Sequence, residues 1–261
     1  AILAIGTRFT QLSTAGWSVK FTGILMHNSV DGEDIGKAFM AVQPIIGDSG
    51  LFLKDLISII KTKIKEPVKR NAEEFIKKYN EKEINIEKHE GIWPIDVVNE
   101  VSKLEYNKVY IDISSTTFDF IRLPIYRPLS WITSETIIEK GIGVSGIALS
   151  ENERNLGITD VHGILNSLSL IAQRLDKAKG ILIIMNDDGL TYLDSTKSDI
   201  PGIGRAFEKI NIDPLLEKTL NAKTITSKDQ LTEELTKPVN GIKVLNVKID
   251  PSFKSVVLQR V

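Results

Sequence analysis

Apolar residues recur at helical spacing between Val161 and Leu175, in the order Val161, Ile164, Leu165, Leu168, Ile171, Ala172 and Leu175. Positions i, i+3, i+4 and i+7 lie on one side of a helix, so this stripe predicts a helix with one buried face. Thr159 or Asp160 can cap its N-terminus, since short polar side chains accept hydrogen bonds from the first free amides. Gly180 is placed to end it, because glycine adopts the left-handed cap conformation without a Cβ clash.

Residues 181–185 read Ile-Leu-Ile-Ile-Met, an apolar run without alternation. Such a run is typical of a strand that is covered on both faces. The turn Asn186–Gly189 is expected to end it. The sequence therefore predicts a helix packed on a central strand, and this pair is the segment around which we arrange the rest of the chain.

Residues 1–50 resemble a separate extension, with an apolar start at Ala1–Ile5 and a short strand over Val19–Ile24. A long helical pattern then runs from Leu53 to Tyr79, and Pro67 predicts a bend or restart within it.

Residues 83–123 alternate as strands do, at 83–86, 109–113 and 118–123. No obvious helix within the chain covers them, which predicts unpaired strand edges that another copy of the chain would pair with. The remaining predicted elements are short helices over 131–139, 200–210 and 213–220, and strands over 223–226, 242–249 and 255–261.

The amino-acid composition excludes several classes of protein. Hydrophobic residues make up 42% and charged residues 26% of the 261 residues, as in an ordinary soluble globular chain. A net charge of −1 offers no global field for nucleic acid. The absence of cysteine excludes disulfides, thiolate metal sites and thiol nucleophiles. Apolar runs are too short for a membrane helix, so we expect a cytoplasmic protein, and the abundance of Ile, Lys and Glu hints at a thermophilic source.

Gly141-Ile-Gly143-Val-Ser-Gly146 matches the G-x-G-x-x-G dinucleotide fingerprint letter for letter. That fingerprint requires a buried strand before the glycines and a helix that starts within them. Here the preceding residues are charged, and the segment 150–155 that follows is polar without a helical stripe. We therefore expect a glycine-rich turn, and an α/β nucleotide-binding enzyme that uses Gly141–Gly146 remains the alternative.

Other candidates for chemistry are weaker. Asp187 and Asp188 follow a strand, as many metal- or phosphate-binding acids do, but an Asp-Asp-Gly turn is also an ordinary way to end a strand. The cluster Asp31–Asp34 can hold a cation or simply be solvated. The three histidines are scattered, and Ser145 is not in a nucleophile-elbow motif. We predict no catalytic, cofactor-binding or metal-binding residues, no cofactor, and no enzymatic activity.

Several short motifs, in the right order over 51–261, are similar to those of encapsulins, the shell proteins of bacterial and archaeal nanocompartments. Gly143–Arg154 resembles the family's G-V-x-G-L-L segment and the loop after it, and the helix and strand up to Asn186 follow as in the family. Val109–Phe120 resembles its extended loop, and Leu56–Trp93 its N-terminal helix, short strand and aromatic turn. Leu215–Thr226 resembles a helix and strand of its axial domain.

The resemblance implies an α+β, tailed-phage major-capsid-like fold. It divides the chain into an N-terminal extension (1–50), an N-terminal helix with extended loop and peripheral domain (51–145), an axial domain (146–238) and C-terminal return strands (239–261). It implies a self-assembling icosahedral shell of many identical copies, a virus-like particle that encloses cargo in the cytoplasm of an archaeon, or the virion of its provirus, where nucleic acid would be the content. A docking peptide of the cargo protein would bind at Phe75, Ile76, Tyr79, Ile84 and Ile86.

Overall fold

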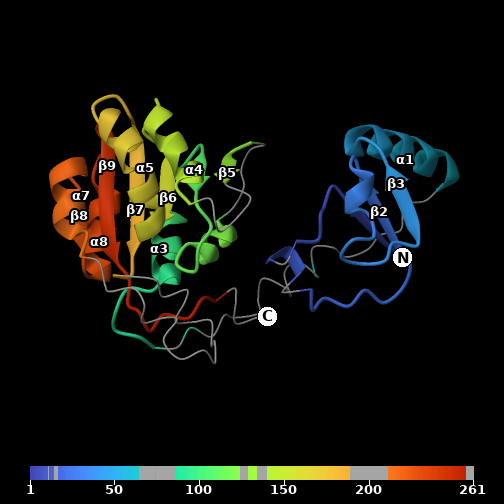
Figure 1. Cartoon of the computed structure of the whole chain (residues 1–261), viewed down its shortest axis with the longest axis horizontal. Coiled ribbons are helices and arrows are strands. Elements are labelled where there is room, and N and C mark those ends of the chain that lie inside the picture. Colours follow the sequence, from blue (N-terminus) through green and yellow to red (C-terminus); the bar gives the residue numbers. More distant parts are fainter. Residues whose placement is uncertain are drawn as a thin grey trace. The chain divides into compact units, whose positions relative to one another are not determined.

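In the computed structural model, the predicted central strand forms as β7 (Gly180–Asn186), and all seven of its residues are buried. The structure describes residues 1–10, 12–14, 17–64, 74, 86, 88–123, 129–133, 140–188 and 211–256. The chain divides into two compact units, unit 1 (residues 1–83) and unit 2 (residues 84–261) (Figure 1). The expected boundary near residue 50 therefore lies inside unit 1.

Unit 2 contains a sheet of six strands that are parallel throughout. The strands are β4 (Val109–Ile111), β5 (Trp131–Thr133), β6 (Leu156–Asp160), β7, β8 (Lys223–Ile225) and β9 (Ile242–Lys248). Their order across the sheet is β5-β4-β6-β7-β9-β8. The chain passes from β4 outward to β5 and then returns to the other side of β4 to form β6, so the direction of winding reverses between β4 and β6.

Helices cover both faces of this sheet, as Figure 1 shows. One face packs against α3 (Pro94–Val101) and α8 (Lys228–Thr236), and the other against α5 (Val161–Gln173) and α7 (Asp213–Leu220). The described part of the unit also has three shorter helices, η3 (Phe118–Arg122), α4 (Ile142–Ser145) and η4 (Gly146–Leu149).

The side chains of β7 explain why its sequence does not alternate. Ile183 and Met185 belong to the apolar cluster on the α3 and α8 side, whereas Leu182 and Ile184 belong to the cluster on the α5 and α7 side. Successive side chains of a strand point to opposite faces, so a sheet that is covered on both faces needs an apolar residue at every position. The mixed α/β content agrees with the α+β prediction in general terms, and the arrangement is a doubly wound parallel sheet.

Several local predictions in unit 2 are confirmed. Asp160 is the N-cap of α5, where its Oδ1 accepts a hydrogen bond of 2.8 Å from the Gly163 amide. The predicted strand over 242–249, the one over 223–226 and the helix over 213–220 also form. Gly180 does not cap α5, because that helix ends at Gln173 and Gly180 begins β7 with φ 133°.

Other predictions were wrong. Of the strands predicted within 83–123, the one over 118–123 is helical at 118–122, the one over 109–113 does form as β4, and the one over 83–86 lies almost wholly outside the described residues. β4 is no free edge, because β5 and β6 pair with it on either side and α3 packs over its face. The described start of the segment predicted as a helix over 131–139 is strand β5. Ser255 and Val256 are not in a strand, and the predicted helix over 200–210 lies outside the described residues.

Unit 1 contains a parallel sheet in the order β1-β2-β3, made of β1 (Ile2–Ile5), β2 (Leu25–Ser29) and β3 (Gln43–Ile46). Short 3-10 helices lie at Leu12–Thr14 and Gly32–Asp34. The predicted strand over 19–24 was misplaced, since the strand begins at Leu25. Its polar residues His27 and Asn28 are buried and hydrogen-bonded to backbone oxygens, which removes the alternation that would have revealed it.

Helix α1 (Ser49–Lys63) begins at its N-cap Asp48, and none of its side chains is buried. The predicted continuation of this helix to Tyr79 falls almost wholly outside the described residues. None of the helices in the described ranges has the length and apolarity that crossing a lipid bilayer requires.

Candidate functional site at the carboxyl edge of the unit 2 sheet

Because the six strands of unit 2 are parallel, all their carboxyl ends lie along one edge of the sheet. In open α/β sheets ligands bind outside this edge, at the point where the winding reverses. Here that point lies between β4 and β6, and the chain places charged or polar residues at the end of each neighbouring strand. These residues are Asp112 after β4, Asp160 at the end of β6, Asn186 and Asp187 at the end of β7, and Lys248 at the end of β9.

Asp112 is fully buried, and its carboxylate joins three elements. Its Oδ2 accepts a hydrogen bond of 2.6 Å from Thr159 Oγ1 at the end of β6, and its Oδ1 accepts one of 3.2 Å from the Val144 amide of α4. Burial raises the pKa of Asp112, because a charged carboxylate is poorly solvated in the interior, although the bonds from Thr159, Val144 and Gly141 act in the opposite direction.

The Gly141–Gly146 segment packs directly against Asp112 and β4. A Cβ on Gly143 would lie 2.3 Å from the Ile111 carbonyl oxygen, and one on Gly146 would lie 2.2 Å from the Tyr110 ring. Glycine is needed here because helix α4 approaches the strand too closely for any side chain. The sequence analysis expected a glycine-rich turn, whereas the structure forms a short helix whose Val144 amide already binds the protein's own carboxylate.

Asp160 forms an ion pair with Lys140, and the distance from Lys140 Nζ to Asp160 Oδ2 is 2.5 Å. Both side chains are largely buried, at 14% and 10% exposure, so water screens this pair less than an exposed one. The Lys140 backbone is held in turn, since Asn166 Nδ2 of α5 donates to its carbonyl oxygen at 3.0 Å.

Asp187 directly follows the last residue of β7. Leu156 and Ile158 of β6 and Ile183 of β7 pack on the α3 and α8 side, whereas the Asp160 carboxylate binds the first turn of α5. Asp160 is paired with Met185 in the sheet register, so Asp187 is two residues beyond it on the adjacent strand. With about 4.8 Å between strands and about 3.3 Å per residue, the two Cα atoms are roughly 8 Å apart.

A partly buried polar network joins the ends of β7 and β9. Asp213, the first residue of α7, accepts hydrogen bonds at its Oδ1 from Asn186 Nδ2 at 2.9 Å and from Asn246 Nδ2 at 2.8 Å. Lys248 Nζ contacts both Asp213 and Asp188. These groups satisfy one another, so we assign them the role of fixing the β7 end, where Asp188 adopts a left-handed φ of 57°.

Two histidines lie at this edge, His162 in the first turn of the helix that Asp160 caps and His89 in contact with Lys228 at the start of α8. Asp31 caps the 3-10 helix at 32–34 through a bond to the Glu33 amide and belongs to unit 1. His27 is buried in unit 1, His89 stacks on Trp93, and His162 lies in the first turn of α5. No group of three or more histidine or acidic side chains in the described ranges is arranged to hold a metal by itself.

The predicted cargo-docking residues fall mostly outside the part of the chain that the structure describes. This applies to Phe75, Ile76, Tyr79 and Ile84. Ile86 is described and is 36% exposed.

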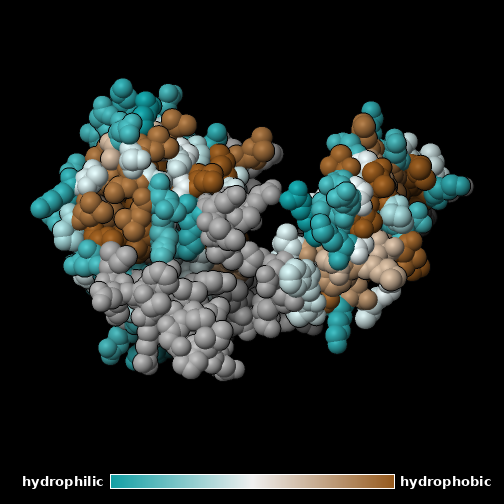
Figure 2. Space-filling view, in the orientation of Figure 1, coloured by the Kyte–Doolittle hydropathy of each residue, from teal (hydrophilic) through white to brown (hydrophobic). Residues whose placement is uncertain are grey.

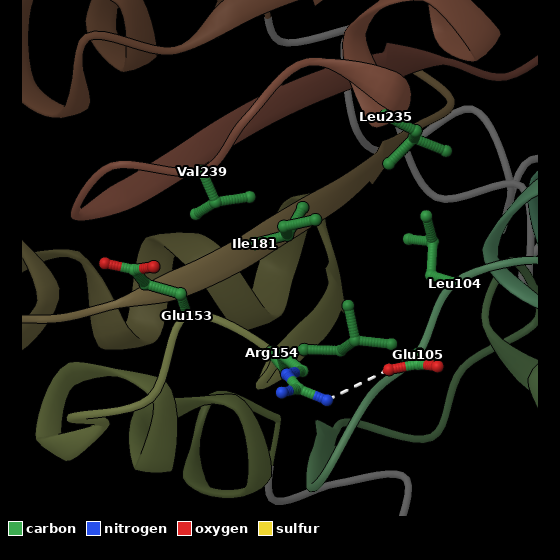
Figure 3. Close-up of a pocket in the computed structure, with 8 residues that line it drawn as sticks. Leu104, Glu105, Glu153, Arg154, Ile181, Leu235 and Val239 are labelled. Atoms are coloured by element: carbon green, nitrogen blue, oxygen red, sulfur yellow. Dashed lines mark hydrogen bonds and ion pairs between the residues drawn. The ribbon is translucent and has the colours of Figure 1, made fainter.

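A cavity of about 260 Å³ lies at the opposite, amino edge of the sheet, by the starts of β6 and β7 (Figure 3). Ile181, Leu235 and Val239 are among the apolar residues that line it, and the ion pair of Arg154 with Glu105 at 2.9 Å closes one side. The charged side chains are exposed and this pair satisfies itself, so nothing there selects a ligand.

Sequence analysis named Asp160 only as a helix cap and missed Asp112 and Lys140. The one signal for the site was the acidic pair Asp187–Asp188 after a buried strand. No protein-family model matches the chain, and no curated protein matches its sequence.

Proposed function

We propose that unit 2 binds a small phosphorylated ligand together with a divalent cation at the carboxyl edge of its sheet, with Asp160 and Asp187 as the protein's ligands to the cation. The observation that supports this most directly is the reversal of winding between β4 and β6, with Asp160 and Asp187 at the adjacent ends of β6 and β7. The proposal concerns binding and assigns no reaction.

The chemistry of the edge favours a cation-bound phosphate over a free one. The carboxylates of Asp160, Asp187, Asp188 and Asp213 outnumber the ammonium groups of Lys140 and Lys248 among the described residues there. A free phosphate would be repelled by this edge. Mg²⁺ is commonly held by one or two carboxylates plus phosphate oxygens and water, so two aspartates suffice when the ligand supplies the other oxygens.

Binding of inorganic pyrophosphate in the presence of Mg²⁺, measured by isothermal titration calorimetry, tests this proposal on the whole chain. The wild type should bind, and D160N and D187N should each bind at least about tenfold more weakly. Asparagine is as good an N-cap as aspartate, so D160N removes the charge and keeps the start of α5. D176N, at an exposed position after α5, makes the same charge change and should bind as the wild type does.

Failure of the wild type to bind, or equal binding by D160N and the wild type, would overturn the proposal. The alternative from the sequence, a nucleotide held on Gly141–Gly146, makes a different prediction. In that case binding would depend on the Val144 amide, which Asp112 occupies, and would not respond to D187N.

Assembly into an encapsulin-like shell is a second proposal, and the tailed-phage capsid fold belongs to it. The sequence supported this assembly by an unpaired strand edge within 83–123, and that support no longer applies because β4 is paired on both sides. Exposed apolar side chains on α1, including Leu51, Ile57 and Ile60, now support self-association instead. Figure 2 shows apolar residues among polar ones on the visible face of unit 1.

Size-exclusion chromatography with light scattering separates the two proposals. A particle of megadalton mass would support the shell, together with a cargo protein that co-purifies with it. A monomer or small oligomer that binds Mg²⁺-pyrophosphate would support the small-ligand site and leave the shell without support.

A further inference from the structure

We infer that a cavity between η3 and the ends of β4 and β5 binds a small neutral molecule with one flat apolar ring and one hydrogen-bond acceptor. The cavity lies in unit 2 and has a volume of about 210 Å³. None of the described residues that line it belongs to the proposed phosphate site. The inference therefore stands apart from that proposal and is tested separately.

The cavity lies where the apolar cluster on the α3 and α8 side reaches the edge of the sheet. β5 is the edge strand next to β4 (Figure 1), and Ile111 is paired with Thr133 at the carboxyl ends of the two strands. Ile111 belongs to the apolar cluster, and Trp131 packs against it. The cavity is thus beside β4 at the carboxyl edge, where open α/β sheets bind their ligands.

The wall of the cavity favours a neutral ligand. Most of the described residues that line it are apolar, namely Ile111, Ile113, Phe118, Ile121 and Trp131. The other two are threonines, and Thr117 Oγ1 already donates to the Asp112 carbonyl oxygen at 2.5 Å. No described lining residue carries a charge, so a phosphate, a carboxylate or an amine would lose its hydration there without gaining a counter-ion.

One donor of the wall residues lacks an acceptor. Trp131 Nε1 is buried and has no hydrogen-bond partner among the described residues. A buried tryptophan usually finds a partner for this N–H group, and a donor that is left without one is unfavourable because it has given up its bond to water. A ligand in the cavity that carries an acceptor would supply the missing bond.

The volume of the cavity sets the size of the ligand. An apolar cavity of about 150 Å³ is large enough to bind benzene, and this cavity is larger by the space of a small substituent. Side chains that line an empty apolar cavity also lack dispersion contacts on one side. A single aromatic ring with a carbonyl group, as in an aryl ketone or aldehyde, would restore these contacts and give Trp131 Nε1 its acceptor.

The experiment compares acetophenone with ethylbenzene, which has nearly the same shape and no acceptor, by nuclear magnetic resonance of the whole chain. Affinities come from the shifts of isoleucine methyl groups, and the tryptophan N–H signals report the hydrogen bond. The chain has three tryptophans, Trp17, Trp93 and Trp131. Acetophenone should shift only the Trp131 N–H signal, and it should bind about tenfold more tightly than ethylbenzene because it satisfies a buried donor.

Three variants make the result specific. W131F keeps an aromatic ring and removes Nε1, so it should bind the two probes with equal affinity. I121W should abolish binding of both, because Ile121 lines the cavity from a half-exposed position and a larger ring can fill the space. I132W makes the same change on the opposite face of β5 and should bind as the wild type does. Unshifted Trp17 and Trp93 signals check that each variant is folded.

Three outcomes would overturn the inference. One is the absence of a saturable shift up to the solubility limit of acetophenone. Another is equal affinity of the wild type for the two probes, which would mean that the site does not select an acceptor. The third is binding that survives in I121W, which would place the probe elsewhere. None of these results bears on pyrophosphate binding, so the proposed function is tested independently.

Discussion

The Oδ2 atom of Asp112 accepts a hydrogen bond of 2.6 Å from Thr159 Oγ1, and this bond joins the ends of β4 and β6 at the point where the winding of the sheet reverses. Both residues are fully buried. The bond brings together two residues that are 47 positions apart. The stability of this junction gives the first two predictions.

The first prediction concerns Asp112→Asn and pH. Burial raises the pKa of Asp112 above its ordinary value of 3.8, so the folded state prefers the neutral acid. The contribution of this group to stability is fully present below about pH 3.8 and is lost as pH rises through the raised pKa of the folded state. An asparagine cannot ionise and keeps an oxygen to accept the Val144 amide.

D112N should therefore become more stable relative to the wild type as pH rises above 3.8, which means that its free energy of unfolding increases relative to that of the wild type. Urea unfolding at a series of pH values measures this difference. A difference that is independent of pH would mean that Asp112 is not stabilised in its neutral form.

The second prediction is that Gly163→Ala destabilises unit 2, although alanine is normally the better helix former. The new Cβ would lie 1.9 Å from Thr159 Oγ1 and 2.5 Å from Asp112 Oδ2, so the junction must move to admit it. We expect a loss of about 1–3 kcal/mol, as for overpacked sites. Thermal and urea unfolding measure it.

Ser169→Ala is the matched control, since Ser169 is exposed on the same helix. Its effect should be a gain of a few tenths of a kcal/mol from helix propensity alone. A gain of stability in G163A comparable to that in S169A would contradict the close packing at Asp112.

The third prediction concerns the covered faces of β7. Ile183 packs on the α3 and α8 side and Ile184 on the α5 and α7 side, and both are fully buried. Replacing either one by alanine should lower the free energy of unfolding by about 2–5 kcal/mol through lost burial and a cavity. Leu215→Ala, at a partly exposed position on α7, should lose under about 1 kcal/mol. A small effect in only one of the two isoleucine variants would indicate that this face of the sheet is poorly covered.

The fourth prediction concerns Glu234, whose carboxylate lies 2.6 Å from Lys223 Nζ and 2.5 Å from Lys237 Nζ. Hydrogen bonds from the two lysines lower the pKa of Glu234 to about 2. A lowered pKa gives stability that is present above the ordinary value of 4.5 and is lost as pH falls toward 2. Glu234→Gln should remove this acid-dependent part of the stability.

Unfolding of E234Q and the wild type at several pH values between 2 and 6 measures the effect. Glu233→Gln is the comparison, because Glu233 is exposed and contacts only Lys237 of these two lysines. The hydrogen bond from Lys237 also lowers the pKa of Glu233, so E233Q should lose a smaller acid-dependent part of the stability. An acid transition of the same size in E234Q and the wild type would contradict the prediction. High salt should weaken the effect, since both lysines are about half exposed.

The sequence was sufficient to predict those helices and strands whose pattern of apolar residues lies entirely within one segment of the chain. The stripe from Val161 to Leu175 predicts α5, and the apolar run at 181–185 predicts β7, because each reports directly which of its faces is covered. Asp160 could be recognised as the cap of α5 for the same reason, since capping joins residues that are three apart.

The short strands and their positions in the sheet could be identified only from the tertiary structure. β4 and β5 have three residues each, and their hydrogen bonds come from other parts of the chain, so no pattern in 109–133 shows that one is central and the other an edge. The same is true of β2, where the buried His27 Nε2 and Asn28 Nδ2 are hydrogen-bonded to the backbone oxygens of Thr7 and Ile45.

The candidate site depends on these long-range pairings. Asp112, Asp160 and Asp187 are each unremarkable in the sequence, and they come to one edge only because parallel strands place their carboxyl ends there. The glycines at 141–146 matched a phosphate-binding motif by their letters, yet in the fold they make room for Tyr110, Ile111 and Asp112. The sequence could determine which residues are glycine or acidic, and the packing of distant strands decided what those residues contact.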